Sequence, residues 1–170
     1  QLLRRGADSV ILLEDKRFSA FLVEDHANAL AELVRREKPY IFLAGATSYG
    51  RTLMPYLATK FFAGLTADCT ILDIEEETGL LLQTRPAIGG NILATIKTTD
   101  ARPQMATIRP HSTKPLEEDP EHEKKRLQST DSIRREKPDE GCFVSRVEYI
   151  GMEELAEDGG ALKDARKIVS

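Results

Sequence analysis

The sequence predicts an α/β fold in which a doubly wound, mostly parallel sheet carries an antiparallel strand extension. Two buried-strand patterns, Ser9–Leu13 and Tyr40–Ala44, are each followed by a helical pattern, as in β–α–β crossovers. Residues 65–109 then show only short strand patterns between turns. A chain of 170 residues is long enough to bury the core that such a Rossmann-like sheet needs.

The first strand and helix have clear patterns. Ser9–Leu13 is the continuous apolar run SVILL, typical of a strand buried on both faces. In Val23–Glu37, apolar residues recur at helical spacing and form one stripe. Glu24 and Asp25 lie in its first turn, where they complement the helix dipole, and Pro39 stops it.

The second strand and helix repeat this order. Tyr40–Ala44 (YIFLA) is a buried-strand pattern, and Arg51–Ala63 is a helical pattern that ends at Gly64. Pro55 is tolerated because it falls in the first turn of the helix. We expect both strands to share one parallel sheet, flanked by the two helices.

Short strands separated by turns follow the second helix. Three apolar runs rich in Ile, Leu and Thr are Cys69–Ile74, Leu80–Gln83 and Asn91–Ile96. Glu75–Gly79 forms a charged turn between the first two runs. We expect an antiparallel extension from residue 69 to residue 109 at the edge of the sheet.

The composition changes after residue 110. Residues 111–140 are dominated by charged residues and proline, which predicts an exposed linker, partly disordered over 112–138, with a possible helical turn at Glu121–Arg126. Residues 141–170 contain a strand pattern at Cys142–Ile150 and a short helix candidate at Met152–Ala156. Residues 1–110 then form the α/β domain. Because the chain opens on the helical turn Leu2–Arg5 and closes on the start of a strand, we expect a fragment.

Charge and composition exclude several classes of protein. The net charge of −4 gives no drive toward nucleic acid or anionic membranes, and no apolar run is long enough to span a bilayer. Cys69 and Cys142 are too few for a disulfide framework, so we expect buried thiols in a reducing compartment, the cytoplasm or a mitochondrial matrix. His26, His111 and His122 are scattered, which predicts no metal site, and no catalytic constellation is visible.

The loop after the second strand is the candidate anion site. It follows a buried strand and opens a helix, so its backbone amides and side chains could face a phosphate. The candidate residues are Gly45, Thr47, Ser48, Gly50 and Arg51. The spacing is neither a P-loop nor a dinucleotide fingerprint. Spacing alone favours a structural interpretation, in which Thr47 or Ser48 caps the helix and Gly50 relieves a tight turn.

Two turn segments are candidates for contact with a partner protein. Both combine polar side chains with stiff prolines, and the candidate residues are Arg85, Gly89, Gly90, Asn91, Arg102 and Gln104. The structural alternative is that the segments are ordinary turns between strands, in which Asn91 bonds its own backbone. The sequence leaves both interpretations open.

Four strings of residues resemble the N-terminal domain of the electron transfer flavoprotein alpha subunit. They are GATSYGRTLMPYLA (Gly45–Ala58), GLTADC (Gly64–Cys69), LLLQTRPAIGGNILATI (Leu80–Ile96) and RPQMATIRP (Arg102–Pro110). The resemblance covers residues 6–110 well and the remainder loosely.

This resemblance implies a heterodimer with a beta subunit. Such proteins accept electrons from flavin dehydrogenases, such as acyl-CoA dehydrogenases, and pass them to another acceptor. It also implies that FAD is carried by the C-terminal domain of the full-length parent, so we expect no cofactor on this chain. By the same resemblance, we expect the first strand and helix of the family's N-terminal domain to be missing from this sequence. The expected function is therefore a scaffold and docking domain of an electron carrier, not an enzyme. The alternative is a module that binds an AMP-type nucleotide at Gly45–Arg51.

Overall fold

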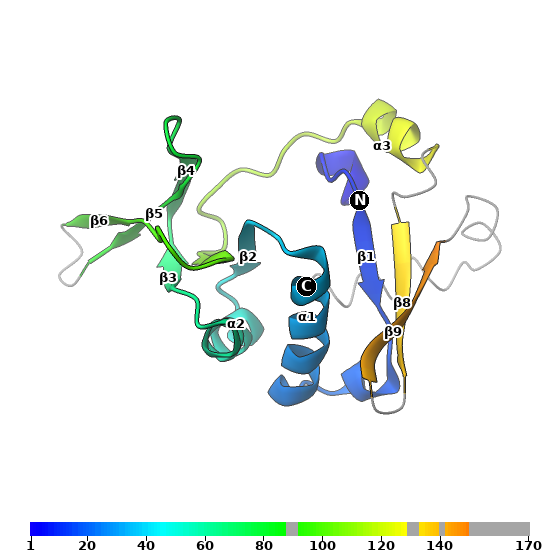
Figure 1. The fold of residues 1–170 in the computed structure, drawn as a ribbon. Helices are drawn as coiled ribbons and strands as arrows, with labels where there is room; N and C mark the ends of the chain where they lie inside the picture. Colours follow the sequence, from blue (N-terminus) through cyan, green and yellow to red (C-terminus); the bar gives the residue numbers. More distant parts are fainter. Residues whose placement is uncertain (88–91, 129–132, 140–141, 150–170) are drawn as a thin grey trace. The chain divides into compact units, whose positions relative to one another are not determined.

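The computed structural model describes residues 1–87, 92–128, 133–139 and 142–149 (Figure 1). The chain divides into two compact units. One consists of residues 20–114, and the other of residues 1–19 with residues 115–170. The two units are described in turn.

A parallel sheet of three strands is the centre of the unit formed by residues 20–114. Its order is β2-β7-β3, with β2 at Ile41–Gly45, β7 at Gln104–Ile108 and β3 at Leu65–Cys69. β7 pairs with β2 from Ile41↔Gln104 to Gly45↔Ile108. Because β7 is central, four of its five residues are buried.

Two helices pack side by side in this unit and bury the main core (Figure 1). α1 spans Val23–Glu37 and α2 spans Ser48–Phe61. Residues of both helices meet Met105 of β7 in a single apolar cluster, whose buried members are Ala27, Ala31, Met54, Leu57, Ala58 and Met105. The predicted helical stripes therefore face the sheet, as their spacing required.

Three antiparallel strands form a second sheet in the same unit, drawn in green in Figure 1. They are β4 at Ile71–Ile74, β5 at Leu81–Pro86 and β6 at Leu93–Ile96, in the order β4-β5-β6. A smaller apolar cluster joins this sheet to the parallel one, with Cys69, Leu81 and Ala106 as its buried members. The fold is thus α/β with a parallel sheet and an antiparallel extension, as predicted.

The other unit holds a separate three-stranded sheet of order β1-β8-β9. β1 is Val10–Leu13, β8 is Ile133–Asp139 and β9 is Cys142–Tyr149. β8 is parallel to β1 and antiparallel to β9. Two short 3-10 helices, η1 at Leu3–Arg5 and η2 at Lys16–Ser19, flank β1. The described residues of this unit also form the α-helix α3, at Pro120–Leu127.

Two expectations about strand pairing are wrong. β1 and β2 lie in different sheets, because the edge of β1 is paired with β8 and that of β2 with β7. Residues 104–108 are not part of the antiparallel extension but form the central parallel strand β7. Both errors have one physical cause: an apolar pattern shows that a segment is a buried strand but does not show which strand lies beside it.

The predicted linker contains two regular elements, α3 and β8. α3 forms because Asp119 caps its first turn, where the side chain accepts hydrogen bonds from the amides of Glu121 and His122. Residues 113–121 are exposed, as their composition predicts. The predicted linker is therefore not structureless at α3 and β8. The division of the chain into domains stays a prediction. The candidate helix Met152–Ala156 lies outside the described residues.

Within the described part of the chain, no helix has the length and apolar character needed to cross a membrane.

Candidate functional site

Polar residues gather where the three parallel strands end. β2 runs into the loop Gly45–Arg51, Asp68 is the residue before the last of β3, and Arg109 directly follows β7. Parallel strands end at a common edge of their sheet, and this edge is where α/β folds usually place functional groups. We call this region the carboxyl edge.

The loop Gly45–Arg51 adopts the structural role that its spacing favours. Thr47 is the N-cap of α2, and its Oγ1 accepts a hydrogen bond of 3.2 Å from the amide of Gly50. The amide of Arg51 donates to the carbonyl of Thr47 at 2.9 Å. One side chain and one carbonyl of the loop are therefore committed to the start of the helix.

Gly50 is required because the first turn of α2 lies directly against the end of β2. A Cβ atom at position 50 would lie 1.9 Å from the carbonyl oxygen of Gly45. A Cβ at position 45 would make only an ordinary contact of 3.6 Å with Thr47. The glycine at position 50 thus serves packing within the chain, and its place is not open to a ligand.

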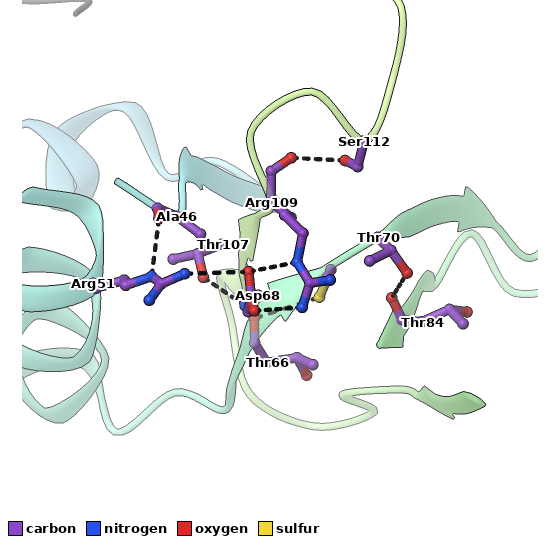
Figure 2. A network of polar contacts seen from close by, with 10 residues as sticks. Ala46, Arg51, Thr66, Asp68, Thr70, Thr84, Thr107, Arg109 and Ser112 are labelled. Atoms are coloured by element: carbon purple, nitrogen blue, oxygen red, sulfur yellow. Dashed lines mark hydrogen bonds and ion pairs between the residues drawn. The ribbon is translucent and has the colours of Figure 1, made fainter. Parts of the chain in front are cut away.

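Asp68 is the centre of a polar network at this edge (Figure 2). Arg109 donates to both of its carboxylate oxygens, from Nε at 3.2 Å and from Nη2 at 2.7 Å. Arg51 reaches the same carboxylate from α2, with Nη2 3.6 Å from Oδ1, while its Nε donates to the carbonyl of Ala46 at 2.9 Å. Two arginines from different elements therefore share one aspartate.

The backbone of Asp68 is also held in place. Its φ angle is 61°, a left-handed conformation that Asp tolerates better than most residues. Its amide donates to Oγ1 of Thr107 on the neighbouring strand at 2.9 Å. The hydrogen bond from Arg109 lowers the pKa of Asp68, and the nearby charges of Arg51 and Arg85 act in the same direction. Asp68 is therefore held as a carboxylate.

Cys69 lies next to Asp68 but takes no part in chemistry at the surface. Its side chain is fully buried, and this burial raises the pKa of its thiol. The charge of Arg85 opposes that rise. The thiol is thus protonated at neutral pH and packs as a small apolar group, as the sequence predicted for it.

The predicted partner-contact residues that the structure describes do not lie together. Arg85 acts on Asp68 and Cys69 at the carboxyl edge. Arg102 lies at the opposite end of the sheet, before β7, where it stacks 4.3 Å from the ring of Tyr40 and donates to its hydroxyl at 2.7 Å. Gly89, Gly90 and Asn91 lie outside the described residues.

Gln104 cannot serve as a contact residue, and this expectation is wrong. Its side chain is fully buried, and its Oε1 accepts a hydrogen bond of 2.9 Å from the amide of Leu81 on β5. The physical reason is that Gln104 opens the central strand β7 and so lies beneath the antiparallel sheet, where its amide satisfies a backbone group.

Sequence reasoning missed Asp68 and Arg109 as members of a polar site. The available signal was their position immediately before the end of one strand and immediately after another. That signal indicates a common site only if the two strands are parallel neighbours. The sequence pattern instead predicts residues 104–108 as part of the antiparallel extension. Thr107, which supports Asp68, was missed for the same reason.

The charges of the arrangement suit acidic groups better than a metal ion. In the described ranges, no group of three or more His, Cys, Asp or Glu residues could hold a metal ion. Arg51, Arg85 and Arg109 surround a single aspartate, which leaves an excess of positive charge at the carboxyl edge.

Comparison with known proteins identifies the family of this chain. A model described as electron transfer flavoprotein domain matches residues 1–132 of the chain. The chain belongs to the electron transfer flavoprotein family. The resemblance of its motifs to the N-terminal domain of the alpha subunit is thereby confirmed.

Several relatives carry names from this family. The electron transfer flavoprotein subunit alpha of Thermoanaerobacterium thermosaccharolyticum is 52% identical over 109 residues, which cover 64% of this chain and 33% of that protein. The subunit alpha of Megasphaera elsdenii is 34% identical over 170 residues, which cover 100% of this chain and 48% of that protein. Subunit LctC of a lactate dehydrogenase (NAD(+),ferredoxin) of Acetobacterium woodii is 45% identical over 109 residues, 64% of this chain and 26% of that protein. The chain thus spans half or less of the length of these electron transfer flavoprotein relatives.

Proposed function

We propose that this chain is the scaffold and subunit-docking domain of an electron transfer flavoprotein alpha subunit. In that role it belongs to a heterodimer with a beta subunit, which carries electrons from flavin dehydrogenases, such as acyl-CoA dehydrogenases, to an acceptor. The observation that carries the proposal is the family match over residues 1–132, together with relatives named as alpha subunits. The chain itself performs no redox chemistry in this account.

The loop Gly45–Arg51 does not fit FAD. A dinucleotide pyrophosphate needs a glycine-rich turn that the ligand can approach closely at a helix N-terminus. In the loop Gly45–Arg51 the approach at Gly50 is filled by the carbonyl of Gly45, and Arg51 is engaged by Ala46 and Asp68. The same contacts argue against the AMP-type alternative, because they occupy the amide of Gly50 and the Nε and Nη2 atoms of Arg51. FAD belongs to the full-length parent in this proposal.

Docking requires surface that the chain does not use for its own fold. Two of the predicted contact residues, Arg85 and Arg102, meet this condition in different ways. The side chain of Arg85 makes no hydrogen bond or ion pair with any residue that the structure describes, whereas Arg102 is exposed but stacks on Tyr40. Both remain in the proposal, as do Gly89, Gly90 and Asn91, and Gln104 is withdrawn from it.

Calorimetric titration of the chain with the beta-type subunit tests the proposed docking. We expect a complex of equal stoichiometry, weakened by more than about 1 kcal/mol in Arg85→Glu. Circular dichroism must show that this variant keeps its fold. Heat changes indistinguishable from dilution, with both proteins folded, would refute the docking function. An unchanged dissociation constant for Arg85→Glu would remove only Arg85 from the interface.

A further inference from the structure

We propose that Arg51, Arg85 and Arg109 form a basic docking surface that receives a carboxylate-bearing segment of the partner subunit. This inference rests on the proposed docking function and names the chemistry that docks at one place. We call the three side chains the arginine surface. They come from α2, from β5 and from the residue after β7. Arg51 and Arg109 meet at Asp68, and Arg85 follows Thr84, whose carbonyl accepts a hydrogen bond of 2.9 Å from the amide of Thr70, two residues after Asp68.

The charge balance at this edge is incomplete within the described chain. Arg51 and Arg109 both form ion pairs with Asp68, at 3.6 Å and 2.7 Å, and the charge of Arg85 also acts on that carboxylate. Three positive groups therefore share one negative group. The chain as a whole carries a net charge of −4, so the excess positive charge here is a local feature of an acidic molecule. A partner with complementary negative charge would be steered to this edge.

Hydrogen-bond donors remain on the arginine surface after the internal contacts are made. Arg109 uses Nε and Nη2 for Asp68, and Arg51 uses Nε for Ala46 and Nη2 for Asp68. The Nη1 atoms of both side chains make no hydrogen bond with a described residue, nor does the side chain of Arg85, whose backbone pairs with Ala94 of β6. A guanidinium group presents its donors in a planar fork that suits a carboxylate.

The internal contacts also prepare the surface for binding. Arg51 is fixed at its base by the carbonyl of Ala46, and Asp68 holds two guanidinium groups apart in defined positions (Figure 2). Asp68 is itself fixed by Thr107. Arginine side chains are costly to immobilise on binding, so prior ordering reduces the entropy lost when a partner docks.

A protein segment suits this surface better than a small free anion. The side chains of Arg51 and Arg109 are 61% and 47% exposed, so water would screen their attraction for an isolated phosphate. A protein partner covers the surface as it binds and excludes that water, which strengthens each charged contact. The exposure therefore favours a carboxylate presented on a protein.

The test measures the affinity of the chain for the beta-type subunit at several salt concentrations. The variants are Arg85→Gln and the triple change Arg51→Gln, Arg85→Gln, Arg109→Gln, with Arg35→Gln as the control. Arg35 is similarly exposed, at 58%, and lies in an ion pair on α1. We expect the triple variant to bind at least about tenfold more weakly at low salt, and to lose most of its salt dependence. Arg35→Gln should bind like the parent chain.

Arg85→Gln keeps the inference testable if the triple variant fails to fold, because the Arg85 side chain makes no hydrogen bond with a described residue and the substitution leaves the backbone pairing with β6 in place. This single change should by itself weaken binding of the beta-type subunit and reduce part of the salt dependence. Parent-like affinity and salt dependence in Arg85→Gln and the triple variant, with their folds intact, would overturn the inference while leaving the docking function in place. Absence of any complex would overturn both.

Inorganic phosphate serves as the probe for a small-anion site. In calorimetry at matched ionic strength, we expect no binding of phosphate to the parent chain. Binding that the triple variant loses, with an unchanged affinity for the beta-type subunit, would overturn the inference and assign these arginines to a small anion instead.

Discussion

Asp68 concentrates several unusual features in one residue. It has a left-handed backbone conformation, an amide bonded to a neighbouring strand, and a carboxylate shared by two arginines. Thr107 fixes the peptide of Asp68, while Arg109 and Arg51 hold its carboxylate. A single residue thus connects the ends of β3, β7 and α2.

Replacement of Arg109 should change how stability depends on pH. The pKa of Asp68 is lower in the folded chain than in the unfolded one, chiefly because Arg109 donates to it. Its contribution is therefore fully present above the unfolded pKa, about 3.9, and is lost as the pH falls through the lower folded pKa. Arg109→Gln should be less stable than the parent near neutral pH, and the difference should shrink as the pH falls below 4, roughly the unfolded value.

The double variant Arg109→Gln, Asp68→Asn supplies the control for this measurement. Asn tolerates the left-handed conformation, so Asp68→Asn removes the charge and keeps the backbone. In the Asp68→Asn background, urea unfolding at several pH values should show no pH-dependent effect of Arg109→Gln. An equally large pH-dependent effect in both backgrounds would show that another carboxylate is responsible.

Gly50→Ala should destabilise the chain strongly, because its new methyl group would overlap the carbonyl of Gly45. We expect a loss of about 1–3 kcal/mol in the free energy of unfolding. Gly45→Ala is the matched control, since its methyl group would make an ordinary contact. The measurement is chemical denaturation of both variants. Equal stabilities would contradict the close packing of α2 on β2.

At the scale of elements, β7 organises the unit that contains it. It lies between β2 and β3, places Met105 against the helices and places Ala106 against the antiparallel sheet. Gln104 and Gln83 are both fully buried in this unit, yet they differ in their partners. Gln104 accepts a hydrogen bond from Leu81, whereas neither amide atom of Gln83 has a partner among the described residues.

These two glutamines should respond differently to methionine, which has a similar length and no amide. Gln104→Met leaves the amide of Leu81 unpaired in the interior and should cost about 1–3 kcal/mol. Gln83→Met removes buried polar atoms that make no internal bond and should leave stability unchanged or raised. Thermal and urea unfolding compare the two. A large loss for Gln83→Met would mean that a partner, such as a buried water molecule, binds that amide.

The local patterns predicted elements well and neighbours poorly. The bounds of α1 follow directly from an apolar stripe stopped by Pro39, and the N-cap role of Thr47 follows from its place before a helix. The pairing of β1 with β8 could not be read in this way, because strand pairing depends on contacts between residues far apart in the chain. The same limit hides the site: the sequence places Arg51 and Arg85 in separate candidate sites, whereas α2 and β5 bring the charges of both to act on Asp68.

At the scale of the whole molecule, the chain consists of two compact units, and the family match extends across segments of both. The unit of residues 20–114 contains the arginine surface, Arg102 and the antiparallel sheet. Several large apolar side chains on that sheet are exposed, among them Ile71 and Leu93. An exposed apolar sheet beside a basic edge is typical of a surface that another protein covers.

We expect the purified chain to be free of flavin. The loop after β2 has no dinucleotide fingerprint, and the amide of Gly50 and the Nε of Arg51 donate within the chain. Visible absorbance of the native protein, and flavin released on denaturation, measure this directly. A yellow protein that released flavin in a near one-to-one ratio would contradict both this prediction and the assignment of FAD to the rest of the parent.

The most direct test of the docking function is sedimentation velocity of the chain mixed with the beta-type subunit. We predict a single faster-sedimenting species whose mass corresponds to one copy of each protein, together with the slower sedimentation of each protein alone. Raising the salt concentration should dissociate the complex in part, because the arginine surface contributes charged contacts. Two independent boundaries at all salt concentrations, with both proteins folded, would contradict the account.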